Sequence, residues 1–115
     1  MDLTGKRRRY AEALDSALQT LALRLGAMPE VRRVVLFGSA AAGRRDLTTD
    51  LDVLVVMDSE DDFVTRTAAL YRRLQLGVDL DLLAYTPAEF ERMRGRTWMR
   101  NALRESRVVY EKDTG

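Results

Sequence analysis

Three short apolar runs, separated by segments with helical spacing, place the strongest constraint on how this chain folds. The runs at residues 31–37, 51–57 and 78–85 are rich in valine and leucine and have the length of ordinary β-strands. Around them, apolar residues recur three and four positions apart at residues 5–25 and 63–74, which is typical of amphipathic helices. This alternation predicts a small α/β or α+β domain.

Turn residues and helix caps complete the expected order of elements. Gly26 is expected to cap the first helix, and Gly38 breaks the first strand. Ser39 is expected to be the N-cap of a single helical turn that ends at Gly43. Thr86 begins the next predicted helix, with proline at the first helical position. The last expected elements are helices at residues 86–94 and 97–105 and an edge strand at residues 108–110.

The composition excludes several kinds of chemistry. With 115 residues and 46% hydrophobic content, residues 1–115 are expected to form one domain with a packed core. The chain has no cysteine and no histidine, which excludes disulfides, thiol nucleophiles and histidine-based catalysis. A metal ion would therefore need oxygen ligands, which favours Mg²⁺. The formal net charge of +1 argues against a general polyanion binder.

The N-terminal segment does not have the pattern of a targeting signal. Basic residues at positions 6–9 are followed by an amphipathic stretch that carries Glu12, Asp15 and Arg24. Nowhere do about 18 apolar residues run together. We therefore expect a cytoplasmic protein with no membrane partner.

Pairs of aspartates stand at the second and third predicted strands. Asp50 and Asp52 bracket Leu51, and Asp79 and Asp81 repeat the arrangement. Side chains two apart on a strand point to the same face, about 6.5–7 Å apart along the chain. Like charges gathered on one face raise each other's pKa unless a cation neutralises them. Two divalent ions roughly 3.5–4 Å apart are a common device for displacement at phosphorus.

The same alternation assigns the two faces of the predicted sheet. On the second strand, Leu51, Val53 and Val55 lie opposite Asp50 and Asp52. On the third strand, apolar residues at even positions lie opposite the acids at positions 79 and 81. The pattern predicts a small mixed sheet with helices packed on one face and the acidic site on the other.

A turn that can hold phosphate precedes the acids. Backbone N–H groups of Gly38 and Ser39, at the end of a strand, can cradle an anion, and Arg44 and Arg45 follow closely. Taken singly, a Gly-Ser pair is usually a turn, Asp-x-Asp is often capping or solvated charge, and paired arginines usually belong to a solvated loop. Their occurrence together, in this order and spacing, favours a nucleoside triphosphate site.

These residues resemble the DNA polymerase beta superfamily, and within it the small stand-alone minimal nucleotidyltransferases. That family has an apolar strand, Gly-Ser, ten residues, Asp-x-Asp, a second apolar strand and a third Asp on a later strand. Here Gly38 and Ser39 are followed by residues 40–49, Asp50 and Asp52, and the closing segments at residues 81–90 and 104–111 are also similar. The resemblance covers nearly the whole chain and implies the nucleotidyltransferase fold.

The resemblance implies a reaction and a role for each residue. Gly38 and Ser39, with Arg44 and Arg45, would bind the nucleotide phosphates. Two Mg²⁺ ions would be held by the catalytic carboxylates, which are Asp50, Asp52 and Asp81. Asp81 would also accept the proton of the acceptor hydroxyl, and Asp79 is the alternative third acid. The reaction would transfer a nucleoside monophosphate, most plausibly AMP from ATP, with release of pyrophosphate.

Two positions depart from the family pattern. Family members usually carry arginine where this chain has Ala42, which puts phosphate contacts in doubt unless Arg44 or Arg45 substitutes. They usually carry serine where this chain has Thr49, which is a mild change. Whether the Ala42 departure abolishes activity stays open.

Two other functions share parts of this sequence pattern. Asp-x-Asp also occurs in haloacid dehalogenases, but there the strand precedes the first Asp, whereas here it follows. Small members of the nucleotidyltransferase family are similar to antitoxins that pair with a helical HEPN-type protein, some of them modifying a tyrosine on it. The chain could thus be an AMP-transferring antitoxin, or a catalytically weak nucleotide-binding partner that acts by protein binding. The acceptor stays open, nucleic acid included, as does a homodimer through the helices around Trp98.

Overall fold

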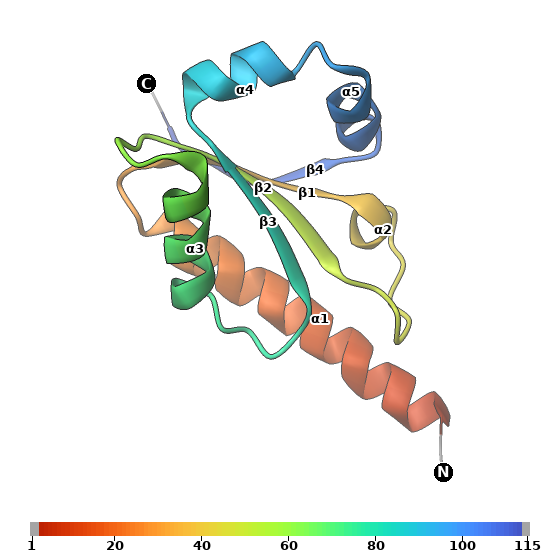
Figure 1. The fold of residues 1–115 in the computed structure, drawn as a ribbon. Coiled ribbons are helices and arrows are strands. Elements are labelled where there is room, and N and C mark those ends of the chain that lie inside the picture. The colour runs from red at the N-terminus through yellow and green to blue at the C-terminus, as the bar shows by residue number, and fades with distance from the viewer. Residues whose placement is uncertain (1–2, 114–115) are drawn as a thin grey trace.

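A four-stranded sheet forms the middle layer of the protein, as seen in a computed structural model that describes residues 3–113 (Figure 1). Helices lie on both sides of this sheet. In chain order the elements are α1 (Leu3–Gly26), β1 (Val31–Phe37), α2 (Gly38–Ala41), β2 (Leu51–Met57), α3 (Phe63–Arg73), β3 (Leu80–Tyr85), α4 (Pro87–Met93), α5 (Thr97–Arg104) and β4 (Arg107–Glu111). The predicted order of helices and strands is confirmed.

The sheet is mixed, with the strand order β3-β2-β1-β4. Strand β1 pairs antiparallel with β2 and with β4. Strand β2 pairs parallel with β3, and α3 supplies the crossover that two parallel neighbours require. The two strands that carry the predicted aspartates are therefore adjacent.

The larger core fills the space between the sheet and the helices α1 and α3. From α1 come Leu14, Leu21 and Leu25, all fully buried, because their spacing places them on one side of the helix. From β2 come Val53 and Val55, which alternate with residues on the opposite face. This layer corresponds to the helix-covered face that the sequence predicts.

A second, smaller core lies on the opposite face of the sheet, under α4 and α5. It contains Leu54 and Val56 of β2, packed with Phe90 of α4 and Met99 of α5. The predicted fold class is confirmed, but helices cover both faces rather than one. The physical reason is that the second half of β2 is apolar at every position, a pattern typical of strands buried on both sides. Within β2 and β3, acids on this face occur only at the beginnings of the two strands.

Two element boundaries near the predicted site differ from the sequence-based expectation. Helix α2 begins at Gly38 with Phe37 as its N-cap, so Ser39 lies inside the helix and does not cap it by a side-chain hydrogen bond. Strand β3 begins at Leu80, two residues later than predicted, so Asp79 precedes the strand. At α4 the expectation holds, since Thr86 and the third helical residue form a reciprocal capping box.

Gly26 serves a different purpose from the one predicted. It is not among the glycines with positive φ, so it does not end α1 in the left-handed conformation. A Cβ atom at Gly26 would lie 2.9 Å from two ring atoms of Tyr110. Glycine is needed here because β4 brings the tyrosine ring against the helix.

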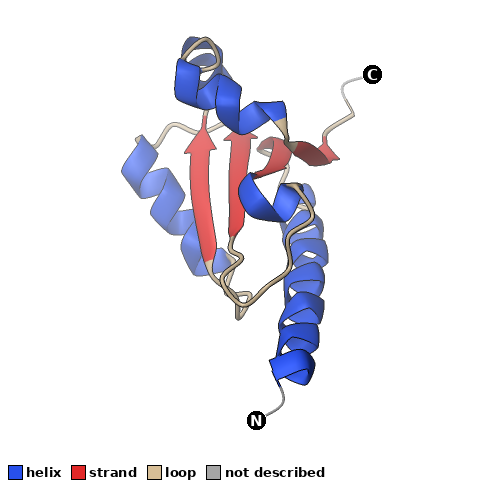
Figure 2. Cartoon of the chain, turned by 90° about the vertical axis from the view of Figure 1, so that its right-hand side faces the viewer, coloured by secondary structure: helices blue, strands red, loops and turns tan. Residues whose placement is uncertain are grey.

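Helix α1 is longer than the surface it covers. Its N-terminal half extends beyond the sheet (Figure 2). The side chains of residues 6–9 are exposed. Over residues 3–113, neither this helix nor any other is long and apolar enough to cross a membrane.

Candidate active site

Asp52 and Asp81 are direct neighbours across the parallel strands β2 and β3. They are register partners, and both side chains belong to the face opposite α1 and α3. Burial, together with the negative charges of Asp81 and Asp50 and a hydrogen bond with Asp81, raises the pKa of Asp52 from 3.8 to about 6. We call these two residues the Asp52–Asp81 pair. Its two carboxyl groups favour binding of a proton or a cation.

The Gly38–Ser39 turn lies directly against this pair. Phe37, the last residue of β1, is the register partner of Asp52, so the turn follows immediately beside it. Gly38 has a φ of +72°, and a Cβ atom there would lie 2.3 Å from Asp52 Oδ2. Only glycine allows this backbone to approach the carboxylate. The two halves of the predicted site thus meet.

The other two candidate acids lie just outside the strands. Asp50 immediately precedes β2, is half-buried, and lies close enough to raise the pKa of Asp52. Asp79 precedes β3 and is exposed, and its carbonyl oxygen accepts a hydrogen bond from the Leu51 N–H at 3.0 Å. Asp79 also borders a hollow of about 390 Å³ together with Tyr10 of α1. Strand register therefore favours Asp81 over Asp79 as the acid that faces Asp52.

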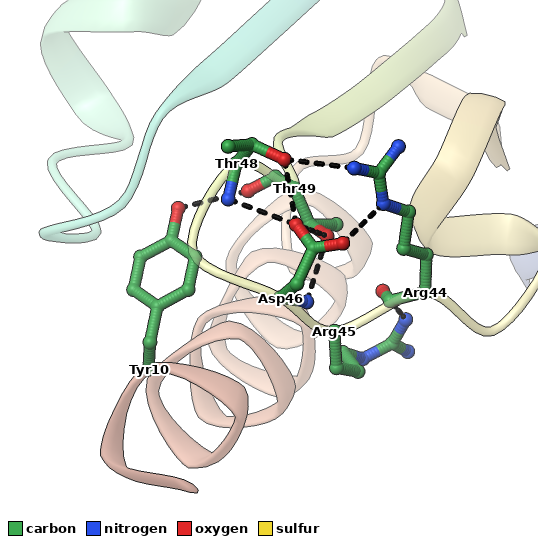
Figure 3. A network of polar contacts seen from close by, with 6 residues as sticks. All are labelled: Tyr10, Arg44, Arg45, Asp46, Thr48 and Thr49. Atoms are coloured by element: carbon green, nitrogen blue, oxygen red, sulfur yellow. Dashed lines mark hydrogen bonds and ion pairs between the residues drawn. The ribbon is translucent and has the colours of Figure 1, made fainter. Parts of the chain in front are cut away.

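The loop before Asp50 is held by a network centred on Asp46 (Figure 3). The Asp46 carboxylate pairs with Arg44 and accepts hydrogen bonds from the N–H and the hydroxyl of Thr48, at 2.9 and 2.6 Å. The buried Thr49 hydroxyl accepts from the Asp46 N–H at 3.0 Å, and Tyr10 donates to the Thr49 carbonyl oxygen at 2.8 Å. Sequence reasoning missed Asp46 and Tyr10, whose roles depend on side-chain geometry and on the packing of α1.

Arg44 and Arg45 are engaged elsewhere than at the Asp52–Asp81 pair. Arg44 contacts Asp46 and the Thr48 hydroxyl. Arg45, whose side chain is only 19% exposed, donates to Asp15 of α1 at 2.9 Å and to the carbonyl oxygens of Ala40 and Arg44 at 2.8 Å. These contacts fasten the loop to α1 and α2. No described contact joins either guanidinium group to Gly38, Ser39 or the acids.

A hollow of about 410 Å³ opens beside the Gly38–Ser39 turn. We call it the α5 hollow. Its lining residues are Phe37, Gly38, Ser39 and Ala42 on one side and Asn101, Ala102, Arg104 and Glu105 on the other. The second wall was missed at the sequence level, because the position of α5 depends on β4 pairing beside β1, a contact distant in sequence.

The donor set fits a divalent cation that is bound together with phosphate. All candidate ligands are carboxylate oxygens, which hard cations prefer. Within residues 3–113, no three acidic side chains are arranged to hold a metal ion by themselves. Mg²⁺ commonly binds one or two carboxylates plus substrate phosphates. The Asp52–Asp81 pair, with its mutual repulsion, matches that requirement.

A mixed sheet with paired acids beside a glycine turn defines a nucleotidyltransferase domain, and comparison with known proteins agrees. Residues 19–115 match the polymerase beta nucleotidyltransferase family, so the chain belongs to that family. A protein of Methanocaldococcus jannaschii, named provisionally as a protein adenylyltransferase, is 30% identical over 80 residues. The match covers 70% of this chain and 79% of that protein.

Two solved structures share the fold. A provisionally assigned nucleotidyltransferase of Sulfolobus solfataricus superposes with a TM-score of 0.58 at 18% identity, covering 98% of this chain and 90% of the other. A chain of the toxin–antitoxin complex MntA–HpeT, in a mutant form, superposes with a TM-score of 0.51 at 18% identity. That match covers 86% of this chain and 73% of the other.

Proposed function

We propose that this chain transfers AMP from ATP to a hydroxyl group on a protein and acts as the antitoxin of a two-component pair. The observation that supports this proposal most strongly is that the Asp52–Asp81 pair lies against the Gly38–Ser39 turn. Membership of the polymerase beta nucleotidyltransferase family supports the reaction class, and the name of the M. jannaschii relative supports a protein acceptor.

The reaction assigns a distinct task to each group. The acceptor oxygen forms a bond to the α-phosphorus of ATP, the bond from that phosphorus to the bridging oxygen breaks, and pyrophosphate leaves. Asp81 takes the proton of the acceptor hydroxyl. Asp50 and Asp52, with Asp81, would hold two Mg²⁺ ions, which supply charge neutralisation for the phosphates. Backbone N–H groups at Gly38 and Ser39 would orient the phosphate chain.

The proposed partner is a helical HEPN-type toxin. Its support is the fold shared with a chain of the MntA–HpeT toxin–antitoxin complex. In this proposal the acceptor hydroxyl of the AMP group belongs to that partner. The partner then presents the acceptor.

The test is incubation with labelled ATP and Mg²⁺, with and without the protein encoded next to this one. We expect label on the partner and release of pyrophosphate, both lost in the double variant Asp50→Asn, Asp52→Asn. Asp58→Asn, an exposed acid at the other end of β2, is the control and should keep activity. ATP binding without label or pyrophosphate would contradict this proposal and favour a nucleotide-binding regulatory module.

A further inference from the structure

Arg104 carries a guanidinium group that no part of the described chain uses. It is the last residue of α5, it is exposed, and no ion pair or side-chain hydrogen bond engages it within residues 3–113. This contrasts with Arg44 and Arg45, whose donors are occupied by Asp46, Asp15 and backbone carbonyl groups. Of these three arginines, only Arg104 is free to bind a ligand.

Arg104 lines the α5 hollow on the wall that faces the Gly38–Ser39 turn. On the side of the hollow that the Gly38–Ser39 turn forms, residue 42 is alanine. Its small side chain leaves the hollow open toward α5. With a volume of about 410 Å³, the hollow falls within the range of small-molecule sites. A group held at the turn would therefore have Arg104 on the facing wall of the same hollow.

The positive charge of Arg104 in this hollow favours an anionic ligand. Glu105 also lines the hollow and repels anions, so the positive charge of Arg104 decides whether one is accepted. The planar guanidinium group makes two parallel hydrogen bonds to phosphate, which a lone ammonium group does not. The Asp52–Asp81 pair on the near side adds further negative charge. Mg²⁺ held by the acids would offset part of this charge, and Arg104 on the opposite wall supplies a further positive charge for a bound triphosphate.

We propose that Arg104 binds the β- or γ-phosphate of the nucleoside triphosphate at the Gly38–Ser39 turn, reaching it across the α5 hollow. This inference rests on the proposed nucleotidyltransferase function and adds a substrate-binding residue to it. It assigns to α5 the role that the sequence pattern suggests for Arg44 and Arg45.

The matched control lies one turn earlier on the same helix. Arg100 is also exposed and cationic, and it lines a neighbouring hollow of about 670 Å³ together with Arg104, but it does not line the α5 hollow. Arg104→Gln and Arg100→Gln therefore change the net charge equally and both alter the neighbouring hollow, but only Arg104→Gln alters the α5 hollow. Neither side chain is buried, so both variants should fold, which thermal unfolding checks.

The experiment measures binding of ATP and of AMP by calorimetry in the presence of Mg²⁺, for the full chain and each variant. We expect Arg104→Gln to weaken ATP binding roughly ten- to a hundredfold, the usual loss for one charge-assisted phosphate contact. AMP binding should change much less, and Arg104→Lys should be intermediate because it keeps the charge without the two-pronged geometry. Arg100→Gln should bind ATP as the wild type does.

Three outcomes would overturn the inference. Unchanged ATP affinity in Arg104→Gln would remove Arg104 from the site while leaving the proposed function intact. Equal losses of ATP affinity in Arg104→Gln and Arg100→Gln would indicate a general basic surface on α5. Absence of ATP binding by the wild-type protein would overturn the proposed function and this inference together.

Discussion

A carbon atom added to Gly38 would lie 2.3 Å from the Oδ2 atom of Asp52, far inside the normal contact distance between a carbon and an oxygen atom. The end of β1 and the start of β2 are thus packed together without room for a side chain. This contact joins the turn proposed to orient phosphate to the carboxylate proposed to hold Mg²⁺. A methyl group added at Gly38 should therefore disturb both the orientation of phosphate and the binding of Mg²⁺.

Gly38→Ala is expected to abolish AMP transfer. The added Cβ must displace either the backbone of the turn or the Asp52 carboxylate, and the φ of +72° adds strain of about 1–2 kcal/mol for a non-glycine residue. Activity and thermal unfolding should be measured together.

Gly43→Ala is the control for backbone strain. Gly43 has a φ of +96°, but nothing lies within 4 Å of the position of its Cβ. This variant should lose a similar amount of stability and keep AMP transfer. If Gly38→Ala kept its activity, or if both variants lost it equally, the close approach to Asp52 would have no functional meaning.

Asp81→Asn is expected to lower the rate of AMP transfer by about a hundredfold or more, as loss of a general base commonly does. Asp79→Asn, two residues earlier, should stay within a few fold of the wild type, because Asp79 precedes β3 and is not the register partner of Asp52. Initial rates of pyrophosphate release measure both. The opposite order of effects would make Asp79 the third carboxylate.

Local patterns were sufficient to predict the strands and the main acids. Period-two alternation placed Asp52 opposite the core residues of β2 and Asp81 opposite those of β3, and the structure confirms both faces. The two acids meet because β2 and β3 pair in parallel register, and Gly38 lies against Asp52. The prediction succeeded because strand alternation depends only on neighbouring residues.

Contacts between segments distant in sequence could not be predicted in the same way. The α5 hollow exists because β4 pairs with β1 and carries α5 toward the Gly38–Ser39 turn. Gly26 looks like a helix cap, but it is required by the ring of Tyr110. The contacts of Arg45 with Asp15 likewise depend on how α1 crosses the loop, which no local pattern records.

Glu89→Gln is expected to destabilise the fold at neutral pH. Glu89 forms an ion pair of 2.6 Å with Arg66, whose side chain is only 2% exposed, and Arg66 also donates to the Ala84 carbonyl oxygen at 2.7 Å. Glutamine keeps the capping hydrogen bond but removes the charge facing Arg66. We expect a loss of about 2 kcal/mol, below the value for a fully buried pair because Glu89 is 29% exposed.

The effect of this variant should depend on pH. Hydrogen bonding from Arg66 lowers the pKa of Glu89 from its ordinary value of 4.5. The pair therefore stabilises the fold above pH 4.5, and this stability is lost as the pH falls through the lowered pKa. Denaturant unfolding at pH 7 and pH 3 should show the difference between wild type and Glu89→Gln shrinking. Glu91→Gln, in an exposed pair with Arg94, is the control and should change stability by no more than about 0.5 kcal/mol.

Asp46→Ala is expected to release the loop that carries Asp50 while leaving the sheet intact. Asp46 joins Arg44, Thr48 and Thr49 in one network, and no other described side chain contacts all three (Figure 3). Amide hydrogen exchange at Thr48 should become faster, because its N–H loses the Asp46 carboxylate, whereas the Thr49 N–H keeps the backbone carbonyl oxygen of residue 46 as its acceptor. AMP transfer should fall by about tenfold or more, since small displacements of catalytic groups are costly.

Asp58→Ala is the control for this prediction. It removes the exposed pair with Arg32 at the far end of β2 and should change neither the exchange rate nor AMP transfer. Faster exchange with full activity would show that the loop does not position Asp50.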